Sequence, residues 1–412
     1  MKQDLDALMQ KYHIDYLWVS GPAQHNPNMV YFTGDCHVTN ADLFYIPGQT
    51  PILLHGMMER DEAAKTGYRL ISYSNYPMQP FTALAKNDPA EASALRYKQI
   101  LEDVGIIKGK VMLYGVREFG PFFSLVTRLQ QLLPEVTFVG DPLELILMEA
   151  RATKSSDEIE RIRHMGVITT AVVQKTLDLL TSHQVVDETL TKPDGQPLTI
   201  GDVKAQINLW LAEAGAENPE STIFAIGRDG AVPHSSGTPT DPIKLGQAIV
   251  YDIFPCEAGG GYFYDFTRTW CLGYAPTEVQ KAYEQVKEVY DTVVSELEVG
   301  VNPARYQART CELYEAMGHE TIRQNPRIEA GYIHGLGHGV GLNVHELPFT
   351  GLENDPTNLL KIGSVMTIEP GLYYPEKGFG IRLEDTWYVK PDNTFAKFVD
   401  FPMDLVIPMK GG

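Results

Sequence analysis

Acidic residues within apolar, strand-like segments constrain the fold of this chain more than any other feature of its sequence. Asp252 follows the apolar run in QAIVYDIF, and Asp265 lies in the returning segment GYFYDFTRTW, after the glycines at 259–261. This order predicts a β-hairpin with one carboxylate on each strand, close enough to share an ion. Two buried carboxylates repel each other unless a cation compensates them. A metal ion is the simplest compensation; the alternative is that Asp252 ends a strand and Asp265 caps a turn.

A second pair of acidic residues repeats this pattern. The segments SVMTIEPGLYY and GFGIRLEDTWYV place Glu369 and Glu384 in equivalent strand positions of a second predicted hairpin. The flanking residues are apolar and β-branched, so both strands are expected to be buried and each glutamate needs a partner. Arg382 lies two residues before Glu384 on the same strand face, and an ion pair between them is the alternative to a metal.

Three histidines lie between the two hairpins, in the glycine-rich segment GYIHGLGHGVGLNVHELP. This segment is not a dinucleotide-binding loop, because Val340 stands where GxGxxG needs glycine, and it is not HExxH, because the second histidine is missing. Glycine lets the backbone pass close to a site, and a neutral imidazole supplies one nitrogen ligand. His334, His338 and His345 are therefore candidate site residues, although a single histidine is more often a packed or capping residue.

The acidic residues and one of these imidazoles form a hard, oxygen-rich ligand set. Such a set suits Mn²⁺, Co²⁺ or Fe²⁺ and also accepts Zn²⁺. Two divalent ions would neutralise four carboxylates. Paired ions roughly 3.5–4 Å apart lower the pKa of a shared water molecule and polarise a carbonyl group. The sequence therefore predicts a two-metal hydrolytic site.

The order of the remaining segments predicts two domains. Strand-like and helix-like segments alternate through residues 1–145, which indicates an α/β domain over residues 1–150. Ser155 or Ser156 is then the candidate N-cap of a long helix that opens a second domain over residues 151–412. Further helices are expected around residues 203–214, 277–298 and 303–318, with β-rich segments before and after the last two. The expected fold class is α+β.

Charge and composition exclude several functions. The formal net charge is −19, which argues against a nucleic-acid-binding protein because such proteins need basic residues to displace phosphate counterions. The four cysteines form no CxxC pair, and the N-terminal segment MKQDLDALMQKYHIDYL does not have the pattern of a secretory signal. No segment reaches the roughly 20 apolar residues that span a bilayer. We expect a cytoplasmic protein that binds neither nucleic acid nor membrane.

Taken together and in order, these motifs resemble the M24-type pita-bread metallopeptidases, the group of methionine aminopeptidase, aminopeptidase P, prolidase and, without metals, creatinase. The resemblance covers nearly the whole chain. The second domain contains YDIF, YDFTRT, HGLGHGVGLNVHELP, TIEPGLYY and IRLED, and RATKSSDEIERIR at its start is also typical. YFTG at residues 31–34 resembles the creatinase-type N-terminal domain. The resemblance implies a C-terminal pita-bread domain preceded by an α/β creatinase-type domain.

The resemblance also implies a role for each metal ligand. Asp252 would chelate one metal ion, Asp265 and Glu384 would bridge both, and His338 with Glu369 would complete the second. Glu369 would in addition act as the general base or acid that moves a proton toward the leaving amine. Twelve residues separate the two aspartates, two more than the commoner spacing of the family. An even insertion at a hairpin tip keeps the strand register, so both aspartates stay in the predicted set.

Four further residues receive implied roles. His345 would stabilise the tetrahedral intermediate or contact the substrate carbonyl. His234, in GRDGAVPHSSGTP, matches the family's substrate-facing histidine; the alternative is a surface loop histidine. His334 would line the pocket, and Arg382 would hold Glu384 in place.

The implied activity is hydrolysis of an Xaa-Pro bond with release of the N-terminal residue, from dipeptides or from longer peptides. The large N-terminal domain favours this proline-specific branch over methionine aminopeptidase. Two alternatives keep the fold: a creatinase-like C–N hydrolase or metal-dependent lyase acting on a small organic substrate, and a non-catalytic binding protein. We expect two divalent ions, preferably Mn²⁺ with Co²⁺, Zn²⁺ or Fe²⁺ as alternatives, a peptide or dipeptide substrate, and a homodimer.

Overall fold

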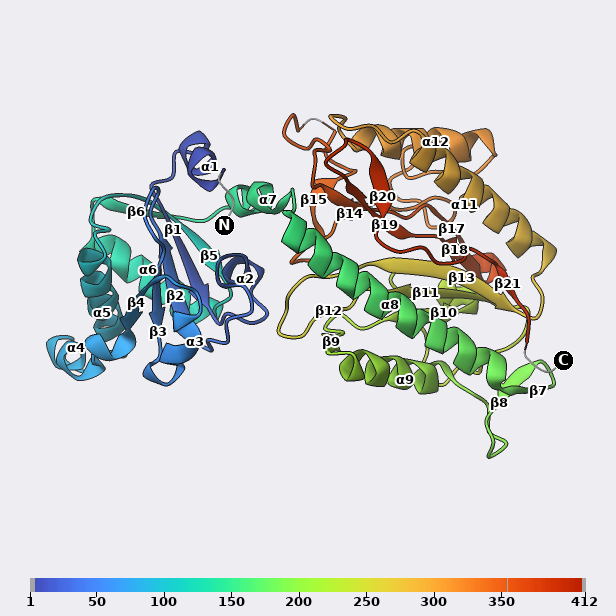
Figure 1. Cartoon of the computed structure of the whole chain (residues 1–412), viewed down its shortest axis with the longest axis horizontal. Coiled ribbons are helices and arrows are strands. Elements are labelled where there is room, and N and C mark those ends of the chain that lie inside the picture. Colours follow the sequence, from blue (N-terminus) through green and yellow to red (C-terminus); the bar gives the residue numbers. More distant parts are fainter. Residues whose placement is uncertain (1–3, 354, 410–412) are drawn as a thin grey trace. The chain divides into compact units, whose positions relative to one another are not determined.

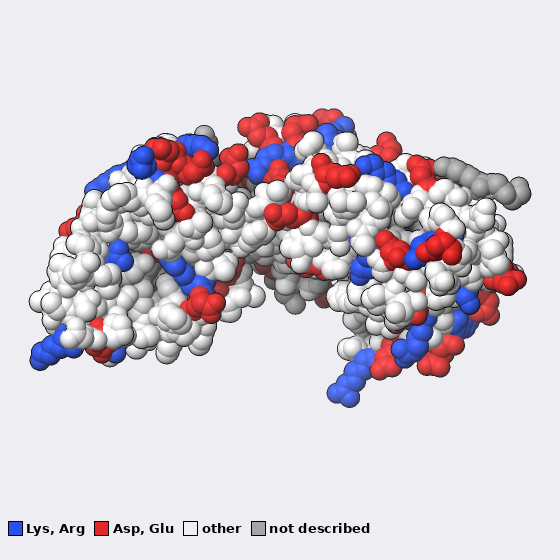
Figure 2. All heavy atoms as spheres, turned by 90° about the horizontal axis from the view of Figure 1, so that it is seen from below, with Lys and Arg blue, Asp and Glu red and all other residues white. Residues whose placement is uncertain are grey.

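The computed structural model describes residues 4–353 and 355–409 of the chain (Figure 1). It divides into two compact units, which are described separately. The first comprises Met1–Arg151 together with Gly259–Gly261. The second comprises Ala152–Ala258 and Tyr262–Gly412. On the face drawn in Figure 2, acidic and basic side chains are interspersed.

The first unit is built around a six-stranded mixed sheet in the order β4-β3-β2-β1-β5-β6. The central strand β1 pairs antiparallel with β2 and parallel with β5. The strands are β1 Tyr16–Gly21, β2 Ala41–Tyr45, β3 Ile52–His55, β4 Arg69–Ser72, β5 Gly109–Gly115 and β6 Val136–Val139. The α-helices of this unit are α1 Leu5–Lys11, α2 Pro27–Thr33, α3 Arg60–Ala64, α4 Met78–Leu84, α5 Pro89–Asp103, α6 Phe119–Leu132 and α7 Leu145–Arg151.

Two hydrophobic cores cover the two faces of this sheet, because successive side chains of a strand point to opposite faces. Leu17 and Val19 of β1 pack into the core that contains residues of α1, α2 and α7. Trp18, between them, packs into the opposite core with residues of α5 and α6. The alternation of strands and helices in the sequence thus produces a sheet with helices on both faces.

The second unit opens with α8, Ser156–Ser182, and its start is capped as the sequence indicates. Ser155 is the N-cap: its Oγ accepts from the Glu158 N–H at 3.4 Å, and Glu158 Oε2 accepts from the Ser155 N–H at 2.6 Å. This reciprocal pair satisfies two of the free N–H groups at the helix start. The other α-helices of this unit are α9 Ile200–Glu213, α10 Gly227–Gly230, α11 Thr277–Ser295 and α12 Ala304–Ala316.

Two larger sheets form the β-structure of the second unit. One has the order β10-β11-β13-β21 and the other the order β15-β14-β16-β19-β20. Their strands are β10 Ile223–Ile226, β11 Ala248–Ile253, β13 Phe266–Leu272, β14 His338–Gly339, β15 Glu346–Phe349, β16 Val365–Ile368, β19 Asp385–Val389, β20 Phe395–Lys397 and β21 Val406–Ile407. Smaller two-stranded sheets pair β17 Gly371–Tyr374 with β18 Phe379–Arg382, β9 Ala216–Glu217 with β12 Cys256–Glu257, and β7 Gln184–Val186 with β8 Thr189–Thr191.

The first predicted hairpin forms, but Asp265 lies just outside the second strand rather than on it. β11 and β13 pair antiparallel, and Asp252 lies opposite Thr267. Asp265 comes immediately before β13, so both aspartates lie at the same end of this strand pair. The insertion between them includes β12, which pairs with β9.

The second hairpin differs from the prediction, because both glutamates lie in breaks between strands. β16 pairs with β19 in the five-stranded sheet, whereas β17 pairs with β18 as a separate ribbon. Glu369 falls between β16 and β17, next to Pro370, which has no N–H to donate to a ladder. Glu384 falls between β18 and β19 and forms an isolated bridge with Thr267. The interruption brings Glu384 against the first hairpin.

None of the helices in the described ranges has the length and apolar character that crossing a membrane requires.

Candidate metal centre

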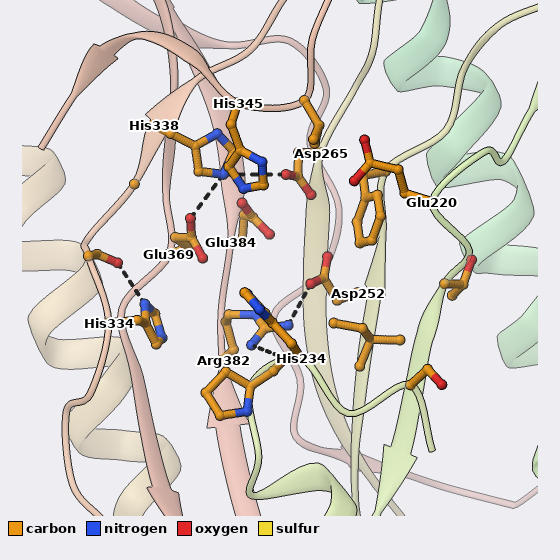
Figure 3. A pocket seen from close by; sticks show the side chains of 18 residues that line it. Glu220, His234, Asp252, Asp265, His334, His338, His345, Glu369, Arg382 and Glu384 are labelled. Atoms are coloured by element: carbon orange, nitrogen blue, oxygen red, sulfur yellow. Dashed lines mark hydrogen bonds and ion pairs between the residues drawn. The ribbon is translucent and has the colours of Figure 1, made fainter. Parts of the chain in front are cut away.

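The second unit contains a cavity of about 400 Å³ that collects the predicted site residues. Figure 3 shows the labelled side chains gathered around it. Every one of the nine predicted residues lines this cavity: His234, Asp252, Asp265, His334, His338, His345, Glu369, Arg382 and Glu384. Residues that are between 2 and 150 positions apart in the chain therefore meet in one place.

Three of these side chains have the spacing of a metal site. Asp265, His338 and Glu384 are buried, and each offers one ligand atom within 4.8 Å of the other two. The His338 Nε2 atom lies 3.6 Å from Asp265 Oδ2 and 3.2 Å from Glu369 Oε1. The arrangement thus contains one nitrogen and several oxygen donors that converge from three separate strand ends.

The hydrogen bonding of the aspartates fits a bound cation. Asp252 Oδ1 and Asp265 Oδ1 are buried and have no hydrogen-bond partner in the part of the chain that the structure describes. A buried carboxylate oxygen without a partner is costly, because it has lost its water without a replacement. Divalent ions would supply that replacement, and hard oxygen donors suit them.

Burial of so much negative charge changes the acidity of the carboxyl groups. Burial raises the pKa of Asp265 well above its ordinary value, and the charge of Asp252 raises it further. The pKa of Glu384 is raised well above its ordinary value by burial and by the charge of Asp265. For Asp252 burial also raises the pKa, although Arg382 opposes the shift. Each of these three carboxyl groups therefore holds a proton more tightly than an exposed carboxyl group does.

His338 and Glu369 form the exception, because each stabilises the charged form of the other. Burial alone would lower the pKa of His338, but the hydrogen bond and charge of Glu369 raise it to about 9. Burial would raise the pKa of Glu369, yet His338 lowers it to about 2.

Glycines position His338 by letting its segment lie against β16 and β15. A Cβ on Gly337 would come 2.1 Å from the Thr367 carbonyl oxygen, and one on Gly339 would come 2.2 Å from that of Leu347. These distances leave no room for a side chain. The Thr367 hydroxyl also accepts a 3.1 Å hydrogen bond from the His338 N–H. The glycines therefore serve close backbone packing that fixes the ligand.

Arg382 does not contact Glu384 as predicted; its guanidinium binds the other hairpin. Nη2 donates to Asp252 Oδ2 at 2.5 Å, Nη1 donates to the Tyr373 hydroxyl at 2.8 Å, and Nε donates to Thr267 Oγ1 at 3.3 Å. The link to Glu384 is indirect, through Thr267, whose hydroxyl donates to Glu384 Oε2 at 2.6 Å. The cause is the strand break before Glu384, which turns the two side chains to different partners.

His334 is held in one tautomer by its neighbours. Nδ1 lies 2.6 Å from the Gly335 carbonyl oxygen, which only accepts, so Nδ1 carries the proton. Nε2 then accepts from the Tyr373 hydroxyl at 2.9 Å. Burial lowers the pKa of His334, in agreement with a neutral ring. A chain of hydrogen bonds thus connects His334 through Tyr373 to Arg382 and Asp252.

His345 lies beside the ligand cluster. Its ring centroid is 4.1 Å from that of His338, and burial together with His338 lowers its pKa to about 4. The ring is therefore neutral near pH 7. The next residue, Glu346, forms a buried 2.5 Å ion pair with Lys154, which anchors this segment. His234 is exposed and lines the same cavity (Figure 3).

Sequence reasoning missed Thr267, Tyr373 and the Lys154–Glu346 pair. Thr267 and Tyr373 lie in the motifs DFTRT and EPGLYY, where strand alternation could have put them on the same face as the neighbouring ligands. Lys154 and Glu346 are 192 residues apart, and nothing local in the sequence connects them.

Comparison with known proteins identifies the family of this chain. The model of metallopeptidase family M24 matches residues 160–391. The Xaa-Pro dipeptidase of Pyrococcus furiosus is 32% identical over 58% of this chain and 61% of its own length. The Xaa-Pro dipeptidase of Pyrococcus horikoshii is 28% identical over 84% of this chain and 87% of its own length. A putative Xaa-Pro aminopeptidase of Mycoplasma genitalium is 29% identical over 58% of this chain and 63% of its own length. The matched region thus spans less than two thirds of the P. furiosus and M. genitalium relatives.

Solved structures show the same fold. A dipeptidase from Pyrococcus horikoshii OT3 superimposes with a TM-score of 0.75 at 22% identity, covering 98% of this chain and 99% of its own. The X-Pro aminopeptidase of Thermotoga maritima gives 0.73 at 22% identity, with 97% and 99% coverage. These matches confirm the predicted α+β pita-bread fold. Since the family model covers more than half of its residues, this chain belongs to metallopeptidase family M24.

Proposed function

We propose that this chain is a dinuclear metal-dependent peptidase that cleaves Xaa-Pro bonds and releases the N-terminal residue from dipeptides or short peptides. The observation that carries the proposal is the buried cluster of Asp265, His338 and Glu384, with Asp252 and Glu369 beside it. As a member of a metallopeptidase family, the chain is expected to bind divalent metal ions there. The relatives with Xaa-Pro in their names support the bond specificity.

The family resemblance implies how five residues would hold the ions. Asp252 would hold one ion, Asp265 and Glu384 would contribute to both, and His338 with Glu369 would hold the second. Mn²⁺ suits this oxygen-rich set, with Co²⁺, Zn²⁺ or Fe²⁺ as alternatives. When bound, the ions lower the pKa of a water molecule and polarise the scissile carbonyl.

The chain's own residues move the proton and orient the substrate. The Glu369 carboxylate lies 3.2 Å from His338 Nε2 and would accept a proton and pass it to the leaving amine. His345 is neutral near pH 7 and can donate a hydrogen bond to the carbonyl oxygen. His234 and His334 line the same cavity and contact the substrate on either side.

The size of the cavity favours a small substrate. About 400 Å³ lies at the lower end of the range for ligand pockets, which suits a dipeptide or the first residues of a short peptide. In this assignment residues 151–412 are the catalytic domain and residues 1–150 are a creatinase-type N-terminal domain. A cytoplasmic homodimer completes the proposal. The relatives are peptidases, which does not favour a lyase or a binding protein.

The test is hydrolysis of Xaa-Pro dipeptides and Xaa-Pro-Yaa tripeptides by protein loaded with Mn²⁺, with Xaa-Ala peptides as controls. Prolyl peptides are expected to be cleaved, and the metal content is expected to be two ions per chain. The Asp265→Asn variant should lose both the cleavage of prolyl peptides and the bound metal. Bound metal without cleavage of any prolyl peptide would contradict the proposal.

A further inference from the structure

Glu220 is the one charged side chain on the described lining of the cavity that the proposed site does not use. The charged lining residues are Glu220, Asp252, Asp265, Glu369, Arg382 and Glu384. Four of the other five are metal ligands of the proposed centre, and Arg382 is paired with Asp252. Across the described ranges, no hydrogen bond or ion pair involves the carboxylate of Glu220, which is exposed. A free carboxylate therefore faces the substrate space.

The backbone places Glu220 next to the first acidic hairpin. Ile223 of β10 pairs with Asp252 of β11, and Glu220 comes three residues before Ile223. Three residues span at most roughly 10 Å, so Glu220 lies close to this edge of the site. In Figure 3 Glu220 lies beyond Asp252 and Asp265, on the side away from His334.

The cavity also offers apolar side chains. Ile223, Phe254 and Val344 line it together with Glu220. A cavity with apolar side chains and an exposed carboxylate suits a long aliphatic side chain with a positive tip, because the stem packs while the charge reaches the acid. Lysine and arginine have this form.

We infer that Glu220 selects substrates whose N-terminal residue carries a positively charged side chain. The inference rests on the proposed Xaa-Pro activity and adds the class of residue accepted. The α-ammonium group is common to all such substrates, so a contact with it would not discriminate between their side chains. Glu220 is exposed and stands apart from the buried cluster of Asp265, His338 and Glu384 (Figure 3), so it is available to the side chain.

The test compares pairs of dipeptides that differ in charge and little in shape. Arg-Pro is matched with citrulline-Pro and Lys-Pro with norleucine-Pro, all with Mn²⁺-loaded protein at low salt. The ratio of kcat/KM for charged over neutral substrate is expected to be roughly fivefold or more in the native protein, in the range of an accessible charge-assisted contact. Glu220→Gln should bring both ratios close to one.

Glu213→Gln is the matched control, because Glu213 is an exposed carboxylate on α9 that does not line the cavity. It removes the same charge and should keep both ratios. If the native protein cleaved all four substrates with both ratios near one, the inference would be overturned and the proposed function would be upheld. An equal loss on charged and neutral substrates in Glu220→Gln would also overturn it, by assigning Glu220 to the α-ammonium group. Failure of the native protein to cleave any of the four would overturn both.

Discussion

Thr267 donates a 2.6 Å hydrogen bond from its hydroxyl to Oε2 of Glu384. The same hydroxyl accepts from Arg382 Nε at 3.3 Å, so one side chain connects the arginine of the β18 ribbon to the glutamate that follows it. All three residues are buried. Glu384 lies between β18 and β19, and we expect this bond to orient its carboxylate toward Asp265 and His338.

Replacing Thr267 by valine tests this orientation. The variant keeps the shape but removes the hydrogen bond to Glu384, so we expect metal affinity to fall about 10- to 100-fold, as for other groups that orient metal ligands. Unsatisfied buried partners should also lower the free energy of unfolding by about 1–3 kcal/mol. Calorimetric titration with Mn²⁺ and thermal unfolding measure the two effects.

Thr269→Val is the matched control. Thr269 is equally buried on the same face of β13, and its hydroxyl donates to the Arg382 carbonyl oxygen at 2.9 Å. Loss of this hydrogen bond should lower the free energy of unfolding by a similar amount and leave the affinity for metal unchanged. Equal metal affinity in the two variants would show that Thr267 does not orient the ligand.

Arg382→Lys tests whether the site needs the guanidinium or only a positive charge. The guanidinium donates to Asp252, Thr267 and Tyr373 at once, which a lysine ammonium on a flexible stem cannot reproduce. We expect kcat on an Xaa-Pro dipeptide to fall about 10- to 100-fold. The variant keeps the net charge, so a change in the long-range field is excluded. A kcat within twofold of the native value would contradict this expectation.

The local features of this site can be predicted from the sequence. The helix start at Ser155 or Ser156 and the strand that ends near Asp252 could be predicted from the side-chain pattern, because capping and strand alternation depend on near neighbours. The five proposed ligands could be named because each lies in a motif with its own residue types.

The partners of those ligands could not be predicted in the same way. Arg382 and Asp252 are 130 residues apart, and they meet only because β18 packs against β11. The break of the second hairpin at Glu369 and Glu384 is also a tertiary effect: the continuous apolar pattern predicts one ladder, while the fold divides it between two sheets. Period-two patterning specifies which face is buried, not which strand lies beside it.

His319 should make the stability of the second unit depend on pH, at a place away from the metal ligands. Nδ1 lies 2.5 Å from the Tyr374 hydroxyl and Nε2 lies 3.1 Å from Gln285 Oε1, an arrangement that suits the neutral ring. Burial, with Lys281 and Lys377 nearby, lowers the pKa of His319 below its ordinary 6.5. The unfolded chain therefore binds the proton more readily, and the stability contributed by His319 is present above pH 6.5 and lost as the pH falls toward the folded pKa.

Thermal unfolding of the native protein and His319→Gln between pH 8 and pH 5 checks this sign. Both proteins are kept metal-free with chelator, so that titration of the acidic cluster is common to them. The native Tm should fall more steeply than that of the variant as the pH drops below about 6.5. Parallel curves would show that protonation of His319 is not linked to folding.

Gly337→Ala should displace the segment that carries His338 from strand β16. The added Cβ would lie 2.1 Å from the Thr367 carbonyl oxygen in β16, so the segment must move away from the strand and take His338 with it. We expect a loss of about 1–3 kcal/mol in the free energy of unfolding and weaker Mn²⁺ binding. Gly335→Ala is the control, because its Cβ would meet only Thr350 Oγ1 at 3.3 Å. If both alanine variants bound Mn²⁺ as tightly as the native protein, close packing at Gly337 would not be what fixes the histidine.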